Sequence, residues 1–267
     1  MSNSRSPIIL SLCQTWLPPL SSTDTAIPDD LIADILLAEQ EARDDALLLA
    51  TAPDYGQFED VPFSARQSVV RDLVVEGADI NVVNKKNGNT PLCNAITRNE
   101  VELVDCLLGF GAAIESDPRG NERHVAPLHL ASWSNRTFMM SHLLSRGGTV
   151  NHLDQTGADA LFYAASSGAH DAMDLLHSHG LLPTHKDHNG RTALCRIVME
   201  DDVDPSTIHK LLRMHATDQD REQDIRAALS CLDDPNRNRQ NRYMEAARYR
   251  TRCLLEDALD TGYSVAP

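Results

Sequence analysis

The sequence predicts an all-α repeat solenoid in which helix-turn-helix pairs are joined by β-hairpin-like fingers and closed by helical caps. Similar segments recur along the chain, and each contains a leucine at the same place, which we call its anchoring leucine. These are Leu92, Leu128, Leu161 and Leu194, and they lie 36, 33 and 33 residues apart. A second feature recurs with the same spacing: a pair of aliphatic residues, followed by a glycine in all but the last copy. The composition agrees, because 42% of the 267 residues are hydrophobic but only 4% are aromatic. Closely packed helices with small aliphatic side chains fit this composition.

The chain begins with a segment, residues 1–27, that we expect to be an extended or mobile arm. Its apolar part (6–20) has Pro18-Pro19 where a signal peptide would carry a small-residue cleavage site. Residues 28–65 are expected to form a helical cap followed by a loop. Within it, residues 28–51 show apolar positions at helical spacing after acidic residues that favour a first turn, and two prolines and a glycine mark 52–65 as a loop.

The repeat array is expected over residues 66–218. In each repeat a short first helix is followed by a turn, a second helix and a polar finger. Pro91 and Pro127 suit the first turn of a helix, where no amide bond is lost. Gly77 and Gly111 come where the second helix must end, in a left-handed conformation.

The remaining residues, 219–267, are expected to form a helical cap and a tail. Residues 222–232 have the composition of a helix. Residues 242–260 place on one face Met244, Ala247, Thr251, Leu254 and Ala258. A polar cap of this kind covers the last repeat of a solenoid.

The repeated segments resemble the ankyrin repeat family, whose pattern is roughly G-x-T-P-L-H-x-A-A followed later by L-L-x-x-G-A-D-x-N. The matching stretches include "GNTPLCNAI" (88–96), "APLHLAS" (126–132), "GADALFYAAS" (157–166) and "GRTALCRIV" (190–198). The resemblance covers roughly residues 66–218, and the first repeat keeps only its second half cleanly. Its first helix is therefore expected at 46–52, separated by an inserted loop.

The resemblance implies a stack of helical hairpins that binds a partner protein on its concave face. It also implies that His129 forms hydrogen bonds between adjacent repeats, although Cys93, Phe162 and Cys195 occupy the same slot elsewhere. In the last repeat, His215 replaces the capping glycine.

The residues expected to contact a partner come from the finger tips and the ends of the first helices, which the fold leaves free to vary. They are Lys86, Asn89, Arg98, Arg123, Trp133, Ser134, Gln155, Ser166, His188, Arg191 and Met199.

Trp133 is the main candidate for an anchor residue, because the fold does not require a large side chain there and exposed tryptophans dominate many interfaces. The alternative is that Trp133 packs under the finger at 115–124. The arginines and lysines on this face suggest a partner with an acidic segment, bound by arginine forks. An ordinary solvated surface explains the same residues.

A different class of function, an enzyme that uses the groove as a small-molecule pocket, stays open. Its first acid or base candidates are His124, Tyr163 and Asp159, although Asp159 also suits a helix N-cap. The sequence contains none of the usual catalytic signatures, such as a P-loop or a G-x-S-x-G turn. We expect no cofactor.

Metal binding is the less favoured interpretation of "HSHGLLPTHKDH" (177–188). His177 and His179 come at the end of a helix, where the dipole favours cations, and His185 and His188 come in a finger. The six cysteines form no C-x-x-C pair, which favours reduced thiols in the cytoplasm or nucleus over a zinc or disulfide framework.

The charge of the chain limits its partners. With a net charge of −15, it is a poor candidate for binding nucleic acid or an anionic membrane, and no apolar stretch is long enough to span a bilayer. The charge is also uneven, because residues 24–60 are rich in acids and residues 237–252 are rich in arginine. A third hypothesis is therefore a scaffold that self-associates end to end through these regions.

Overall fold

The computed structural model describes residues 29–51, 63–115, 125–200, 203–233 and 242–260. This part of the chain contains twelve helices and no strand. The chain divides into two compact units, Met1–Glu39 and Gln40–Pro267. Of the first unit, the described residues are the beginning of helix α2 (Asp29–Thr51), and the predicted arm at 1–27 lies outside them.

The second unit contains five helix pairs, and the predicted solenoid of helical hairpins is confirmed. The first helices of the second to fifth repeats are α4 (Pro91–Arg98), α6 (Pro127–Trp133), α8 (Ala160–Ser166) and α10 (Ala193–Ile197). The second helices of the five repeats are α3 (Phe63–Val75), α5 (Val101–Gly109), α7 (Thr137–Ser145), α9 (His170–Ser178) and α11 (Pro205–Arg213).

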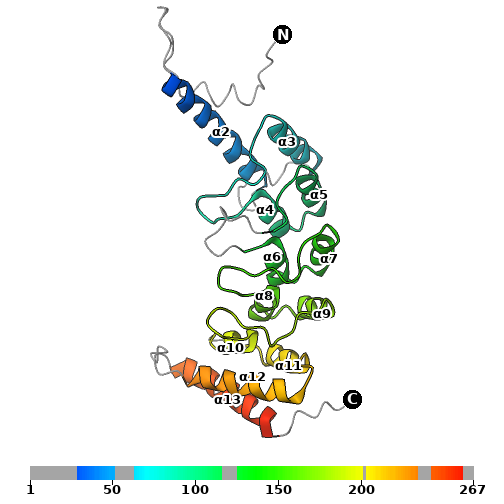
Figure 1. Cartoon of the computed structure of the whole chain (residues 1–267), viewed down its shortest axis with the longest axis vertical. Helices are drawn as coiled ribbons and strands as arrows, with labels where there is room; N and C mark the ends of the chain where they lie inside the picture. Colours follow the sequence, from blue (N-terminus) through cyan, green and yellow to red (C-terminus); the bar gives the residue numbers. More distant parts are fainter. Residues whose placement is uncertain (1–28, 52–62, 116–124, 201–202, 234–241, 261–267) are drawn as a thin grey trace, which may run out of the picture. The chain divides into compact units, whose positions relative to one another are not determined.

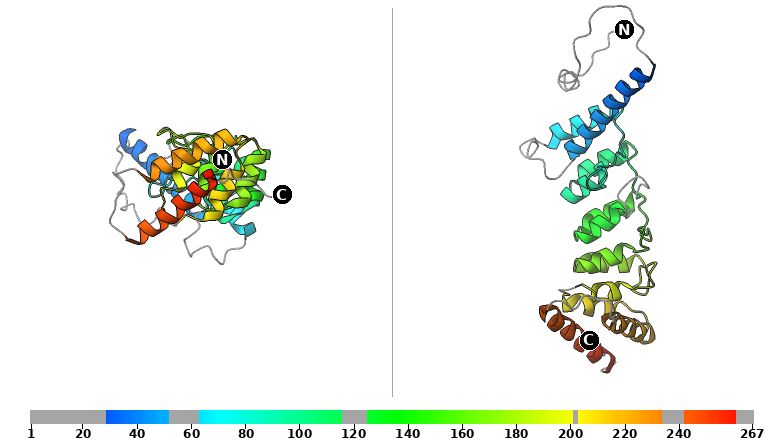
Figure 2. Two further views of the ribbon diagram at one scale, coloured as in Figure 1. Left: turned by 90° about the horizontal axis from the view of Figure 1, so that it is seen from below. Right: turned by 90° about the vertical axis from the view of Figure 1, so that its left-hand side faces the viewer.

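The repeats stack so that like helices lie side by side. Figure 1 shows the first helices in one row, the second helices in a parallel row and the connecting fingers on the opposite side of the first helices. The right-hand view of Figure 2 shows the pairs as successive layers. Helix α6 packs against both α4 and α8, and α8 packs against α10. Each repeat therefore buries its apolar surface mainly against its neighbours, as expected for a solenoid.

The core between the layers consists of small and aliphatic side chains. All four anchoring leucines are buried, and so are Ala95, Ala131 and Ala164 on the same helices. Phe162 is the largest fully buried side chain among the described residues. The low aromatic content thus matches an interface in which small residues let helices approach closely.

Polar residues cap the first helices as the sequence predicts. The hydroxyls of Thr90 and Thr192 accept hydrogen bonds from the backbone N–H groups of Cys93 and Cys195, and the carboxylate of Asp159 accepts two at the start of α8. In the third repeat Ala126 has no side-chain acceptor. There the ring of His129 accepts a bond from the N–H of Ala126 instead.

The end of α2 serves as the first helix of the first repeat, which the sequence predicts at residues 46–52; the described part of this helix ends at Thr51. Leu47 and Thr51 are fully buried, and the amide of Asn94 on α4 donates to the hydroxyl of Thr51. Asp44 accepts a bond from the N–H of Asp79 in the following finger. Helix α3 begins at Phe63, three residues before the expected start of the array.

The second helix of each of four repeats ends at a glycine in the left-handed region, as predicted; Gly77 and Gly147, for example, both have φ of +98°. The fifth repeat differs, because His215 takes the glycine's place and is not among the described residues with positive φ. Its ring is instead buried against the C-terminal cap, where it bonds to Asp224. Helix α11 therefore ends in a side-chain contact and not in a glycine turn.

Two helices, α12 (Asp218–Leu232) and α13 (Arg242–Asp260), follow the last repeat. Helix α12 packs on α10 and buries Ile225 and Ala228, and α13 packs on α12. On α13 the fully buried residue is Leu255, whereas the predicted Leu254 is only partly buried. Ala258 is buried as predicted, so the predicted apolar face of this helix is partly correct and omits Leu255.

A left-handed residue seven positions after each anchoring leucine shapes the turn inside three repeats. Asn99 (φ 61°), Asn135 (φ 52°) and Gly168 (φ 66°) occupy these places. The side-chain oxygen of Asn135 also accepts a bond from the N–H of Ala172 in the next repeat, at 2.9 Å. In the third repeat this turn therefore fixes both the hairpin and its position on the next repeat.

Candidate functional site

The fingers are held by one recurring hydrogen-bonded turn. Asp154 accepts bonds from the N–H groups of Thr156 and Ala158, and Asp187 accepts bonds from those of Asn189 and Arg191. Asn84 takes the equivalent place in the first finger, where its oxygen accepts a bond from the N–H of Lys86. Side chains that accept bonds from the backbone two residues further on stabilise tight turns. The finger tips are therefore preformed.

Adjacent fingers also contact each other directly. The N–H of His188 donates to the carbonyl of Thr156 at 2.9 Å, and the ring of His185 bonds to the carbonyl of Gly157 at 2.9 Å. A side chain on Gly157 would collide with His188, since its Cβ would lie 2.9 Å from the backbone nitrogen. This close approach requires glycine at position 157.

Between the fingers and the first helices lies a surface formed by two rows of side chains. The positions two residues after the anchoring leucines are Asn94, Leu130, Tyr163 and Arg196, and the positions five residues after them are Thr97, Trp133, Ser166 and Met199. Within the first row, Leu130, Tyr163 and Arg196 are each partly exposed. We call the surface made by these rows and the fingers the first-helix face.

An aromatic cluster occupies the middle of the first-helix face. The ring of Tyr163 stacks on the ring of His129, with centroids 4.8 Å apart, and its hydroxyl donates to Asp154 at 2.7 Å. The guanidinium carbon of Arg196 lies 5.9 Å from the ring centroid of Tyr163 and 6.0 Å from that of Phe162. Both distances lie within the range of cation–π contacts.

The charges in this cluster are defined by burial and hydrogen bonding. Burial lowers the pKa of His129 to about 4, against the opposing effect of its bond to the His152 carbonyl. Burial alone would raise the pKa of the Asp154 carboxyl, but donors from Thr156, Tyr163 and Ala158 together hold the pKa below its usual range. At neutral pH the cluster thus contains a neutral imidazole, a carboxylate with four donors and the cation of Arg196.

Trp133 is 51% exposed at the end of α6, so the expectation of an accessible indole is met by the geometry. It shares its row with Ser166 and Met199 of the next two repeats. An exposed tryptophan on a rigid helix end has the properties of an interface anchor.

The other predicted contact residues have varied surroundings. Lys86, Ser134, Gln155 and His188 are exposed, and Asn89, Arg191 and Met199 are partly exposed. Arg98 donates to Glu100 at 2.7 Å and is mostly buried, so its charge is met within its own repeat. Arg123 lies outside the described residues, as does most of the finger at 115–124.

Ser166 has an unusual position on the first-helix face, because its hydroxyl oxygen is buried without a hydrogen-bond partner. An unpaired buried hydroxyl costs stability. We expect Ser166→Ala to raise the free energy of unfolding by up to about 1 kcal/mol, measured by urea denaturation. Ser132→Ala is the comparison, since that hydroxyl donates to the Leu128 carbonyl at 2.7 Å. A Ser166→Ala variant less stable than Ser132→Ala would contradict this assignment.

The two acid and base candidates that the structure describes, Asp159 and Tyr163, have structural roles. Asp159 caps α8, and burial raises the pKa of its carboxyl. Tyr163 is held between His129 and Asp154, and His124 lies outside the described residues. The two described candidates are thus engaged in holding the fold.

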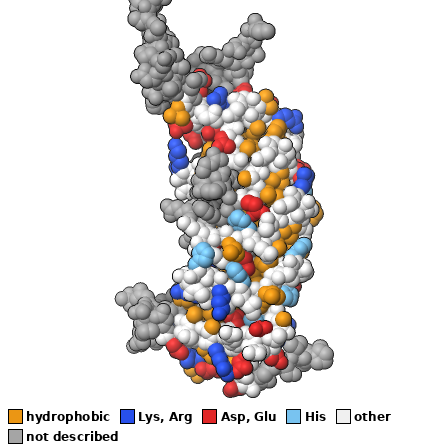
Figure 3. Space-filling view, in the orientation of Figure 1, with side chains coloured by type: hydrophobic (Ala, Val, Ile, Leu, Met, Phe, Trp, Pro, Cys, Tyr) orange, Lys and Arg blue, Asp and Glu red, His pale blue; other side chains and the backbone are white. Residues whose placement is uncertain are grey.

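The four histidines of the 177–188 segment do not converge on one point. His177 bonds to the carbonyl of Leu181 and His185 to that of Gly157, while His188 is exposed at a finger tip. Within the described ranges, no three His, Cys, Asp or Glu side chains are grouped as metal ligands. In Figure 3 imidazoles are spread over the middle of the visible face, and apolar side chains gather over the second helices.

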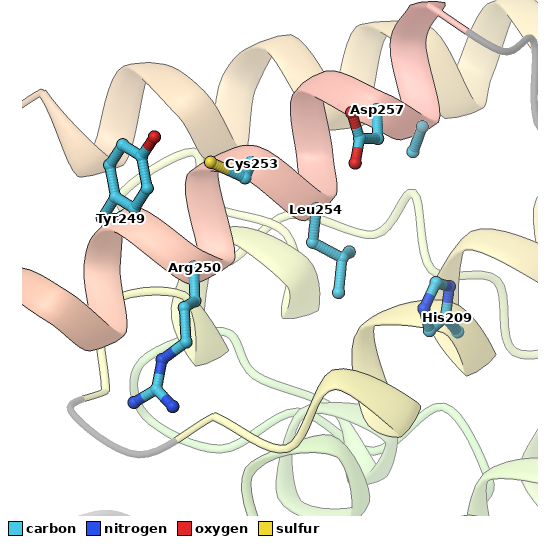
Figure 4. A pocket seen from close by; sticks show the side chains of 7 residues that line it. His209, Tyr249, Arg250, Cys253, Leu254 and Asp257 are labelled. Atoms are coloured by element: carbon cyan, nitrogen blue, oxygen red, sulfur yellow. The ribbon is translucent and has the colours of Figure 1, made fainter.

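Two open pockets lie at the ends of the second unit. One, of about 480 Å³, lies between the end of α2 and the first finger, and its lining includes Asp45, Leu49, Val82 and Lys86. The other, of about 500 Å³, lies between α11 and α13. Figure 4 shows that its lining includes a thiol, Cys253, an imidazole, His209, and a carboxylate, Asp257.

The second pocket lacks the geometry of a nucleophilic site. In Figure 4 the side chain of Leu254 lies between Cys253 and His209. A hydrogen bond from Tyr249 to Cys253 is the main cause that raises the pKa of Tyr249. Cysteine catalysis requires a base within hydrogen-bonding reach of the thiol. The thiol here is directed toward a tyrosine instead.

Sequence reasoning missed Arg196 and Leu130 as surface residues of the first-helix face. The sequence did contain a signal for them, because both lie two positions after an anchoring leucine. On a helix this position is on the same side as the residue five positions after the leucine, where contact residues were expected. The contact of Arg196 with Tyr163 depends on the stacking of two repeats, which the sequence pattern alone did not specify.

Comparisons with known proteins agree with the stacked architecture. The family described as "Ankyrin repeats (3 copies)" matches residues 63–154 and 128–223. Similar proteins include Ankyrin repeat domain-containing protein SAT10 of Stachybotrys chartarum, with 26% identity over 161 residues, 51% of this chain and 8% of that protein. Ankyrin repeat and SOCS box protein 6 of Mus musculus is 34% identical over 96 residues, 36% of this chain and 22% of that protein.

A third relative is SH3 and multiple ankyrin repeat domains protein 1 of Homo sapiens, 32% identical over 100 residues, 37% of this chain and 4% of that protein. The chain thus spans less than a quarter of the length of each of these relatives. Among the described helices, none is long and apolar enough to cross a membrane.

Proposed function

The chain belongs to the ankyrin repeat family, whose arrays are protein–protein interaction modules, and we propose that it binds a partner protein through the first-helix face, with Trp133 as the anchor. The proposal is supported most by the exposure of Trp133. Its side chain is 51% exposed, and it lies at the end of α6, a helix whose other side is packed in the core. Rigid surfaces lose little conformational entropy on binding. A large apolar side chain presented on such a surface gives an incoming partner an immediate area to bury.

The arrangement of polar groups favours binding over chemistry. The described acid and base candidates, Tyr163 and Asp159, have their polar atoms in hydrogen bonds that hold the finger and the helix start. The two pockets described above are open to solvent and lie at the ends of the array, and Tyr163 lines neither of them. An open surface with preformed fingers suits a polypeptide better than a small molecule.

Replacing Trp133 with alanine is expected to weaken partner binding by about 30-fold or more, since a hot-spot residue contributes about 2 kcal/mol. The measurement starts with a random peptide display library selected on the whole wild-type chain. The affinities of the enriched peptides are then compared between wild type and variant by fluorescence polarisation.

The matched control is Phe138→Ala, because Phe138 is 71% exposed but lies on α7, a second helix. It should leave peptide affinity unchanged. Peptides that bind Trp133→Ala as tightly as wild type, while circular dichroism shows both proteins folded, would refute the proposed surface.

A further inference from the structure

We propose that Arg196 is an anion receptor on the first-helix face and that it binds an Asp or Glu side chain of the partner protein. This inference rests on the proposed function and adds the chemistry of the partner. Arg196 is not one of the residues that the sequence pattern marks as a contact. Its environment in the folded stack carries the inference.

The guanidinium of Arg196 is positioned by aromatic rings and not by a carboxylate. It lies 5.9 Å from the ring centroid of Tyr163 and 6.0 Å from that of Phe162. Within the described part of the chain no acidic side chain lies within ion-pair distance of it. Arginines elsewhere in this acidic protein do have such partners, since Arg98 pairs with Glu100 and Arg146 with Asp105.

The carboxylates of two adjacent fingers, Asp154 and Asp187, already have their own hydrogen-bond donors. Asp154 accepts bonds from two backbone N–H groups and from the hydroxyls of Thr156 and Tyr163. Asp187 lies nine positions before Arg196, which is the same spacing as that between Asp154 and Tyr163. Its carboxylate accepts hydrogen bonds from two backbone N–H groups of its finger. Arg196 contacts the rings of the preceding repeat instead of bonding to Asp187. Its N–H donors are therefore left for an external acceptor.

The support beneath Arg196 is rigid, which makes the site preorganised. The Tyr163 ring stacks on His129 of the third repeat and is tied through its hydroxyl to Asp154. Phe162 is fully buried and cannot move aside. A planar guanidinium that rests on aromatic rings keeps its edge free, and this edge matches the two oxygens of a carboxylate.

The overall charge selects the kind of anion. A net charge of −15 repels a polyanion such as nucleic acid. The single cation of Arg196 therefore suits one carboxylate in a partner segment that also contains uncharged residues. Leu130 and Trp133 on α6, two repeats before Arg196, are apolar side chains with exposed surface in the same rows. The expected ligand is a peptide segment with an acidic residue near apolar or aromatic ones.

The test uses the whole chain and parallel selections from one random peptide display library on wild type and on Arg196→Gln. Wild type is expected to enrich peptides with an Asp or Glu at a fixed spacing from apolar residues. Synthetic copies of these peptides should bind Arg196→Gln at least 10-fold more weakly, and Arg196→Lys should recover only part of the loss because lysine lacks the planar fork. Arg196→Glu should reverse the selection toward Lys and Arg.

The matched control is Arg213→Gln, because Arg213 is an exposed arginine at the end of the second helix α11 and should leave the affinities unchanged. Circular dichroism establishes that each variant is folded. Wild-type peptides that lack an acidic preference, or that bind Arg196→Gln as tightly as wild type, overturn the inference while the proposed function survives. A selection that enriches no peptide on any folded variant refutes the proposed function itself.

Discussion

Replacing Asp224 with alanine is expected to lower the free energy of unfolding by about 3–5 kcal/mol, because it leaves two buried polar groups without a partner and each of these costs about 1–3 kcal/mol. Asp224 on α12 is only 3% exposed at its side chain, and it bonds to the fully buried ring of His215 at 3.1 Å. Its other oxygen accepts the hydroxyl of Thr192, the residue that caps α10. The carboxylate of Asp224 therefore joins the C-terminal cap to both helices of the fifth repeat, α10 and α11.

The loss is large because the variant leaves two polar partners unpaired in a dry interface. The other ring nitrogen of His215 is already buried without a partner, so this imidazole has no alternative acceptor in the described residues. The measurement is urea denaturation followed by circular dichroism. Glu222→Ala on the same helix is the matched control, since Glu222 pairs with Arg226 at an exposed site and should cost less than about 1 kcal/mol.

A double-mutant cycle with His215→Ala tests the coupling. The two substitutions should together cost about 1–3 kcal/mol less than the sum of the single effects, because each removes the same interaction. Strictly additive losses would show that the Asp224–His215 contact does not stabilise the protein.

Lowering the pH is expected to destabilise the array through His129. Burial sets the folded pKa of His129 to about 4, and the unfolded value is 6.5. The folded state keeps the ring neutral, so the unfolded state takes up the proton first as the pH falls. The stability from this residue is complete above pH 6.5 and is lost progressively between pH 6.5 and pH 4. The loss amounts to about 2 kcal/mol by pH 5 and about 3 kcal/mol by pH 4.

His129→Phe isolates this contribution, because Phe162 fills the same slot in the next repeat. At pH 7.5 the variant should be about 2–4 kcal/mol less stable, since the Ala126 N–H and the His152 carbonyl lose their partner. The gap between wild type and variant should narrow by about 2 kcal/mol at pH 5. Parallel pH profiles for the two proteins would refute the assignment of a neutral buried ring.

Much of the fold could be predicted because it repeats. The spacing of Leu92 to Leu194 placed the helix pairs, and the glycines placed the ends of the second helices. In α13 the sequence placed Ala258 correctly but missed Leu255, because a single helix, with Leu254 and Leu255 adjacent, lacks a repeat against which to check it.

Less of the candidate surface could be predicted, because its chemistry arises between repeats. The sequence indicated Trp133 as a side chain that the core does not need, and this side chain is 51% exposed. It could not show that Arg98 is paired with Glu100 or that Arg196 rests on Tyr163, since both depend on rotamers fixed by packing. Arg123 and His124 remain predictions, because they lie outside the described residues.

The contacts from His129 through Tyr163 to Arg196 pass through three consecutive layers of the stack. These layers therefore cannot be treated as interchangeable cassettes. Deleting the fourth layer would remove Tyr163, the ring that supports the cation, and duplicating it would place the ring that stacks on His129 and the ring that supports Arg196 in different layers. Changes in the length of the array that preserve this surface must occur outside residues 126–196, and an engineered chimera should transplant the three layers as one block.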